Sequence, residues 1–190
     1  MSAALLIVDV QHDFLPGGAL GVADGDAVIP ALVAAAEDAD VVVVSRDAHP
    51  ADHCSFTEQG GIWPVHCVEG THGAELHPAI AALEPDVRIA KATTREVDAY
   101  SAFDATGLAE ELRARGVDRV VIGGLATDYC VLASALDGRR EGFDVVVVSD
   151  AVRAVEKTPG DSARAVAKME AAGVRFLPSS AVFATDLFQD

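Results

Sequence analysis

Basic residues are scarce in this chain. Among its 190 residues, lysine and arginine number 14 and aspartate and glutamate 30, so the formal net charge is −16. Such a chain repels the phosphates of nucleic acids and the headgroups of anionic membranes. Because the acidic residues are scattered rather than gathered in one tail, we expect an acidic surface, and we expect neither a nucleic acid nor a membrane as a partner.

Cysteine is also rare. There are three, Cys54, Cys67 and Cys130, and an odd number without regular spacing is not a disulfide framework. No Cys-x-x-Cys pair is present, which excludes a zinc ribbon. Long apolar runs are missing too: none reaches the ~18 residues of a membrane-spanning helix, and no basic, apolar leader opens the chain. These absences predict a reducing, cytoplasmic location.

Hydrophobic residues, in contrast, make up 51% of the chain, as in globular proteins. The length falls within the ~100–200 residues of one domain, and no linker or repeat interrupts it. We therefore expect a single domain over residues 1–190.

Runs of β-branched and aliphatic residues recur along the chain and alternate with helix-compatible segments. The predicted strands are 4–10, 40–45, 86–90, 118–123, 144–149 and 174–177, and the predicted helices are 27–39, 107–115, 129–141 and 160–172. Continuous apolar strands indicate burial on both faces, as in a parallel sheet. Gly116, Gly142 and Gly173 follow three of the helices at the position where a helix often ends. The pattern predicts an α/β fold with right-handed crossovers.

Two segments do not fit this alternation. One is the glycine-rich stretch 11–25. The other, 47–77, holds five of the six histidines, two cysteines and the only tryptophan. Loops of this length in a compact domain are usually functional.

Polar residues stand where predicted strands end: Asp9, Asp47, Lys91, Cys130 and Asp150. Ligands of open α/β sheets bind beyond these carboxyl ends. Cys130 lies where a strand gives way to a helix, and the N–H groups and dipole there favour a thiolate. Asp9 could accept its proton, and Lys91 could stabilise both charges. Taken singly, each is better explained structurally: a buried thiol, a loop cap and a surface lysine.

A second group is Asp47-Ala48-His49, with His53 and His66 downstream. A carboxylate and imidazoles that leave open positions are typical of a catalytic metal site, and zinc, iron and manganese all suit these ligands. A histidine-rich surface loop explains the histidines almost equally well. His12, His72 and His77 have no comparable placement, and we interpret them as structural. Three aromatic residues in loops after strands, Phe14, Trp63 and Tyr100, could clamp a flat ring or simply pack over the sheet edge.

With these residues assembled, the chain resembles the isochorismatase-like cysteine hydrolase family, and within it the nicotinamidases. The matching segments, in the family's order, are 6–14, 45–56, 63–68, 91–103 and 123–131. The resemblance implies a three-layer sandwich in which helices cover both faces of a central, six-stranded, mostly parallel sheet of Rossmann-like topology.

The resemblance also implies roles for individual residues. Asp9, Lys91 and Cys130 would form a catalytic triad. Asp47, His49 and His66 would hold one divalent transition metal ion, with zinc favoured over iron or manganese, and His53 is a ligand in only some family members. A cis peptide between Leu125 and Ala126 would turn the Ala126 N–H beside that of Cys130 to form an oxyanion hole. Phe14, Trp63, Tyr100, Leu125 and Ala126 would bind the substrate.

The implied reaction is hydrolysis of nicotinamide to nicotinate and ammonia through a cysteine thioester, as part of NAD salvage, with pyrazinamide as a further substrate. A homo-oligomer is compatible with the resemblance. The nearest alternative is an amidase or ureidohydrolase of the same family that acts on a carbamoyl or ureido compound. Two others are a hydrolase with metal-bound water as the nucleophile and a non-catalytic binding protein, although the intact triad argues against the last.

Overall fold

A computed structural model describes residues 2–183 of the chain. The strands are β1 Ser2–Val8, β2 Val41–Asp47, β3 Val87–Lys91, β4 Val117–Leu125, β5 Asp144–Arg153 and β6 Arg175–Leu177. They form one six-stranded sheet in the order β3-β2-β1-β4-β5-β6, and every pairing within it is parallel. The α/β prediction is confirmed, and the sheet expected to be mostly parallel is entirely so across the described residues.

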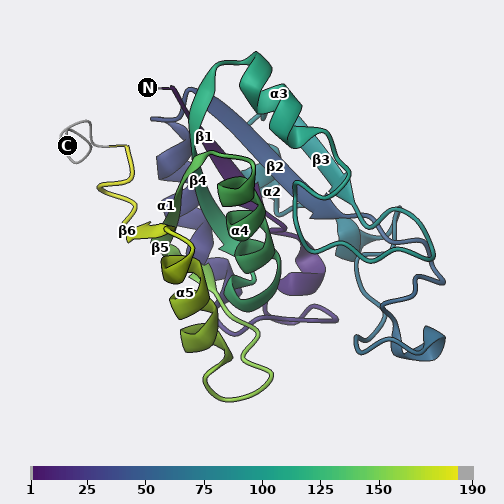
Figure 1. Cartoon of the computed structure of the whole chain (residues 1–190). Coiled ribbons are helices and arrows are strands. Elements are labelled where there is room, and N and C mark those ends of the chain that lie inside the picture. Colours follow the sequence, from purple (N-terminus) through teal and green to yellow (C-terminus); the bar gives the residue numbers. More distant parts are fainter. Residues whose placement is uncertain (1, 184–190) are drawn as a thin grey trace.

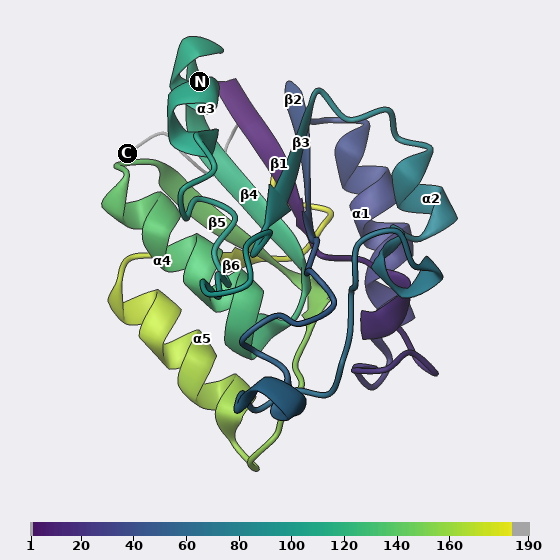
Figure 2. The same cartoon turned by 90° about the vertical axis from the view of Figure 1, so that its right-hand side faces the viewer.

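Helices cover both faces of the sheet. Helices α1 Ile29–Ala36 and α2 Pro78–Ala81 lie on one side, and α3 Leu108–Ala114, α4 Leu132–Arg140 and α5 Asp161–Ala171 on the other. Figure 2 shows the resulting three layers, with the sheet seen nearly edge-on between the two groups of helices. The described part of the chain contains no helix that is both long and apolar enough to cross a membrane.

The two faces of β1 explain why the strands are continuously apolar. Leu6 and Val8 pack in the core beneath α3, α4 and α5, whereas Leu5 and Ile7 pack in the core beneath α1 and α2. Because successive side chains of a strand point to opposite faces, both sets must be hydrophobic when both faces are covered.

Helix ends follow the sequence prediction. The φ angles of Gly116, Gly142 and Gly173 are +72°, +90° and +82°, and each glycine follows the last residues of α3, α4 or α5. The helix predicted over 129–141 differs in its first turn, because the segment Thr127–Val131 is π-helical and α4 begins only at Leu132. Cys130 therefore lies within an irregular turn and not in the first turn of an α-helix.

Strand β4 extends beyond its predicted end at Gly123, through Gly124 to Leu125. These glycines resemble a strand end in the sequence, but Gly124 pairs with Val8 of β1. A Cβ on Gly124 would lie 2.1 Å from the Val8 carbonyl oxygen. The absence of a side chain thus allows β1 and β4 to approach closely just before Asp9 and Cys130.

The loops that follow β1, β2, β3 and β4 gather at the carboxyl edge of the sheet. Figure 1 shows the long segment after β2 extending from this edge, beside the loop that follows β1. An isolated antiparallel bridge between Gln11 and Leu76 joins the two loops. Polar residues at four strand ends are thereby brought to one region.

Replacing Gly124 with alanine should lower the free energy of unfolding by about 2–5 kcal/mol, because the added Cβ meets the Val8 oxygen and φ is +123°. The matched control is Gly142→Ala, where φ is +90° but no atom lies within 4 Å of the added Cβ. The control should lose only about 1–2 kcal/mol. Urea unfolding midpoints of both variants test this, and equal losses would contradict the argument from close approach.

Candidate active site

A buried lysine connects three acidic groups at the carboxyl edge of the sheet. Lys91, the last residue of β3, places Nζ 2.9 Å from Asp9 Oδ2 and 2.5 Å from Asp47 Oδ1. The same nitrogen lies 3.5 Å from Cys130 Sγ and donates to the Ala99 carbonyl at 3.3 Å. The structure thus brings together the three residues predicted to form the triad.

The two oxygens of Asp9 have different partners. Ser45 donates its hydroxyl proton to Asp9 Oδ1 at 2.7 Å. Oδ2 makes an ion-pair contact with Lys91 but has no hydrogen-bond partner among the described residues. Ligand atoms of Asp9, Asp47 and Cys130 all lie within 4.8 Å of one another. Oδ2 is therefore the oxygen available to accept the Cys130 proton.

Burial determines how these groups are charged. It raises the pKa of Asp9, an effect that Lys91 only partly offsets. Burial acts in the same direction on Asp47, but Lys91 and His49 outweigh it and hold the pKa of Asp47 below its usual range. The lysine itself stays protonated, because Asp47, Asp9 and Cys130 raise its pKa despite burial.

The buried surroundings of Cys130 oppose the thiolate that its place between a strand and a helix was expected to favour. Burial, with the charges of Asp9 and Asp47, raises the pKa of the Cys130 thiol well above its ordinary value, although Lys91 opposes this. Burial therefore favours the neutral thiol, and a nucleophilic Cys130 would need a base to take its proton. The need for a base agrees with the sequence-based hypothesis that Asp9 accepts the proton of Cys130.

The predicted metal ligands also converge. Asp47, His49 and His66 are all buried, and one ligand atom of each lies within 4.8 Å of the others. His49 Nδ1 lies 3.2 Å from the Ala92 carbonyl oxygen and His66 Nδ1 lies 2.8 Å from that of Pro64. A carbonyl can only accept, so each Nδ1 carries the proton and each Nε2 keeps a lone pair. Two Nε2 atoms and a carboxylate with its pKa held low fit a divalent transition metal ion.

His53 lies beside this set rather than in it. Its ring stacks on that of His49 with 4.2 Å between centroids. Nε2 lies 3.1 Å from the Val97 carbonyl oxygen, and Nδ1 lies 2.8 Å from Ser55 Oγ. Because Nε2 must donate to the carbonyl, Nδ1 accepts from Ser55, and both nitrogens are occupied.

A pocket joins the thiol to the predicted metal ligands. It is lined by Phe14, Leu20, Asp47, His49, Ser55, Trp63, His66, Asp98, Ala99, Tyr100, Ala126, Tyr129, Cys130 and Val155. Four of the five predicted substrate contacts are present. Leu125 is not, because its side chain packs in the core on the α1 face of the sheet. The peptide between Leu125 and Ala126 is cis, as the resemblance implied.

Aromatic side chains form much of the pocket wall. Trp63 Nε1 donates to Tyr100 Oη at 3.0 Å, and the Trp63 and Tyr129 rings meet edge-to-face with centroids 4.9 Å apart. Phe14 packs against His66, with ring centroids 5.5 Å apart. Sequence reasoning missed Tyr129, although an aromatic residue directly before Cys130 was a usable signal.

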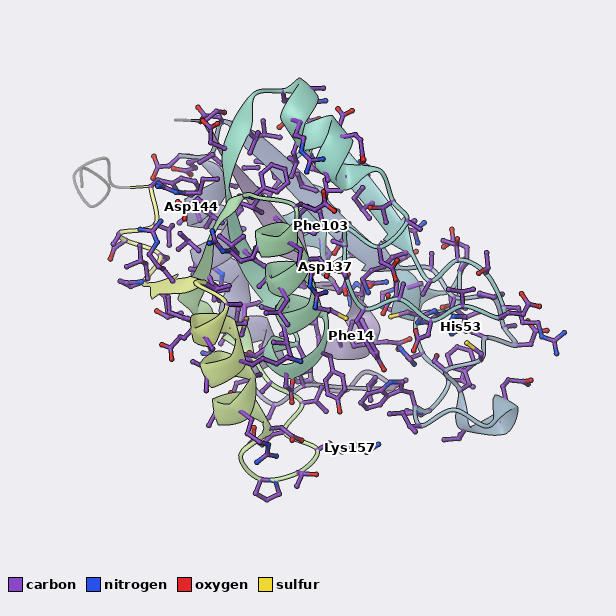
Figure 3. All side chains as sticks on the ribbon, viewed as in Figure 1. Phe14, His53, Phe103, Asp137, Asp144 and Lys157 are labelled. Atoms are coloured by element: carbon purple, nitrogen blue, oxygen red, sulfur yellow. The ribbon has the colours of Figure 1, made fainter. Side chains whose placement is uncertain are left out.

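The loop after β5 closes another side of the pocket. Asp128, in the turn that carries Cys130, accepts the N–H groups of Val155 and Glu156 at 2.9 Å each. Lys157 Nζ lies 4.8 Å from the centroid of the Trp63 ring. Figure 3 shows Lys157 on this loop and His53 in the long loop after β2. Sequence reasoning also missed Val155 as a pocket residue, although its position shortly after the end of β5 was a usable signal.

Asp150 is the one strand-end residue that does not reach this site. Its carboxylate accepts the N–H and the hydroxyl of Ser179 at 2.7 and 2.6 Å. The strand does not end there, because β5 continues to Arg153, so Asp150 binds the segment after β6 instead.

Solved structures of two other proteins share this fold. The pyrazinamidase of Pyrococcus horikoshii, in complex with zinc, has a TM-score of 0.86 and 44% identity, covering 94% of this chain and 99% of that one. PnC1 from L. infantum, in complex with nicotinate, has a TM-score of 0.89 and 39% identity, covering 95% and 94%. The predicted three-layer fold is confirmed by these similarities.

Sequence comparison leads to the same group of proteins. A nicotinamidase from Acinetobacter baylyi is 38% identical over 200 residues, which cover 94% of this chain and 93% of that protein. The family model described as the isochorismatase domain matches residues 3–180. Since that match spans nearly the whole chain, the protein belongs to the isochorismatase family.

Proposed function

We propose that this protein hydrolyses nicotinamide to nicotinate and ammonia through a thioester on Cys130. The observation that carries the proposal is that one pocket is lined both by Cys130 and by the set Asp47, His49 and His66. Lys91 contacts both Asp9 and Cys130 beside this pocket. The similar proteins support it, since one is named a nicotinamidase and another is in complex with nicotinate. Pyrazinamide, another flat aromatic carboxamide, is the expected second substrate, in line with the similar pyrazinamidase.

In this proposal the substrate ring lies among Phe14, Trp63, Tyr100 and Tyr129, which give it flat apolar contacts. The Trp63–Tyr100 hydrogen bond fixes two of these side chains before the substrate enters. Asp47, His49 and His66 would hold the divalent ion, zinc in preference to iron or manganese. When bound, the ion supplies a positive point toward which the pyridine nitrogen turns, so that the amide carbonyl faces Cys130.

The chemical steps then use the chain's own residues. Asp9 Oδ2 takes the thiol proton, and Sγ attacks the amide carbon. The N–H groups of Ala126 and Cys130 hold the resulting oxyanion, where loss of one donor typically costs ~10²–10³ in rate. Asp9 returns the proton to the departing nitrogen, and ammonia leaves. Water, activated by Asp9, hydrolyses the thioester to nicotinate and restores the thiol.

All three cysteines are free thiols in the structure, and Cys54 is partly exposed. Free thiols fit the cytoplasmic location we propose for the reaction. The deciding experiment measures ammonia release from nicotinamide by the purified protein, with bound metal quantified in the same sample. A folded, metal-loaded sample that releases no ammonia would overturn the proposal and favour a carbamoyl or ureido substrate.

Replacing Cys130 with alanine should reduce turnover by about 10⁴-fold or more while leaving nicotinamide binding, because the nucleophile is lost and the pocket walls remain. The matched control is Cys54→Ala, which should keep turnover, since Cys54 does not line the pocket. In the Cys54→Ala background, alkylation should still abolish ammonia release. Substantial hydrolysis by Cys130→Ala would favour metal-bound water as the nucleophile.

Replacing His66 with glutamine should weaken metal binding by at least ~10²-fold and reduce turnover with it, because one Nε2 ligand is lost. His53→Gln is the comparison, since neither His53 nitrogen has a free lone pair. The His53→Gln variant should retain its bound metal through gel filtration. The measurement is metal per folded chain for both variants, and equal loss in the two would make His53 a fourth ligand.

A further inference from the structure

A second cluster of metal-binding side chains lies outside the active site, where the loop after β1 meets the segment before α2. His12, His72 and Glu75 each offer one ligand atom, and these atoms lie within 4.8 Å of one another. The His12 and His72 rings stack with centroids 4.0 Å apart, and His72 Nδ1 lies 2.9 Å from Glu75 Oε2. We propose that these three residues form a surface site for a divalent transition metal ion such as zinc.

The backbone already holds the ligands together. The His12 N–H donates to the Glu75 carbonyl at 3.0 Å, and the His77 N–H donates to the Val10 carbonyl at 2.9 Å. Between them, Gln11 and Leu76 form the antiparallel bridge. The two segments are therefore joined on both sides of the cluster, so binding a metal requires little ordering of the backbone.

The Asp13 side chain strengthens this junction. Its carboxylate accepts the Cys67 N–H at 2.7 Å and occupies the space where a Cβ on residue 73 would lie, 2.1 Å from Oδ2. Gly73 is thus the residue that lets the segment between His72 and Glu75 pack against the loop carrying His12. This close packing fixes the spacing of the proposed ligands.

The chemistry of the donors selects the class of ion. Two imidazole nitrogens and one carboxylate oxygen suit zinc and its neighbours in the first transition row, whereas magnesium and calcium prefer oxygen alone. The ion would replace the proton between His72 Nδ1 and Glu75 Oε2. The net charge of −16 favours any cation.

His77 is close to the cluster but is not a ligand. Its ring centroid lies 6.2 Å from that of His12. Its Nδ1 accepts the Ala79 N–H at 3.2 Å as the N-cap of α2, so the ring proton must be on Nε2. His77→Asn therefore serves as a matched control, because asparagine can keep the cap while a neighbouring histidine is removed.

The test uses the holoenzyme dialysed against micromolar free Zn²⁺ in excess Mg²⁺, with zinc per chain measured by mass spectrometry. The wild-type protein should bind about one zinc more per chain than His12→Gln or His72→Gln, and His77→Asn should match the wild type. His72 and Glu75 side chains are 74% and 66% exposed, so removing His72 leaves the core intact.

Zinc contents that are equal in the wild-type protein and in His12→Gln would overturn the proposal, as would loss of zinc in His77→Asn alone. The buried set Asp47, His49 and His66 is unchanged in all of these variants, so any zinc bound there adds equally to every measurement. The outcome is consequently independent of whether the protein hydrolyses nicotinamide.

Discussion

The position of one buried ammonium group determines how the site is built. Lys91 Nζ contacts Asp9 and Asp47 at ion-pair distance and lies next to the Cys130 sulfur. Burying two carboxylates side by side is strongly unfavourable unless a cation lies between them, and removing one member of such a buried set typically costs about 3–5 kcal/mol. Lys91 therefore stabilises the folded arrangement of the buried acidic groups.

Asp47 connects the two halves of the pocket. One of its oxygens contacts Lys91, and the other lies 3.6 Å from His49 Nε2 in the proposed metal set. The Asp47 carboxylate thus contacts both the lysine and the proposed metal ligands, so a displacement of Lys91 would also displace the carboxylate oxygen beside His49. This arrangement explains why the thiol and the metal-binding nitrogens open into the same narrow pocket rather than into separate ones.

The parallel sheet supplies this geometry through its register. Asp47 pairs with Lys91 across β2 and β3, and Val8 pairs with Ser45 on one side and Gly124 on the other. Asp9 follows Val8 directly, so it emerges between Ser45 and the turn that carries Cys130. The close approach at Gly124 brings that turn toward β1.

The sequence was sufficient for those parts of the site that depend on topology. Asp9, Asp47, Lys91 and Cys130 end consecutive or neighbouring strands, and strand ends of a parallel sheet meet at one edge. The direction in which a side chain points was harder to predict. Leu125 lies next to the pocket residue Ala126 in the sequence, but its side chain packs in the core. Tyr129 and Val155 were missed, because pocket walls depend on how loops fold over the sheet. The effect of the helix terminus on Cys130 was only one contribution, since the protonation state of the thiol depends on the sum of the buried charges.

That sum also explains why a neutral thiol suits the reaction. The buried groups around Sγ are Lys91, whose pKa is raised, and the carboxyl groups of Asp9 and Asp47, which both contact the ammonium group. A thiolate formed by losing a proton to water would add a further buried negative charge. The proposed transfer from Sγ to Asp9 would instead leave the total charge of the group unchanged and move the negative charge from one neighbour of Lys91 to another. Because the ammonium group is adjacent to the anion before and after the transfer, little reorganisation is needed in this proposed step.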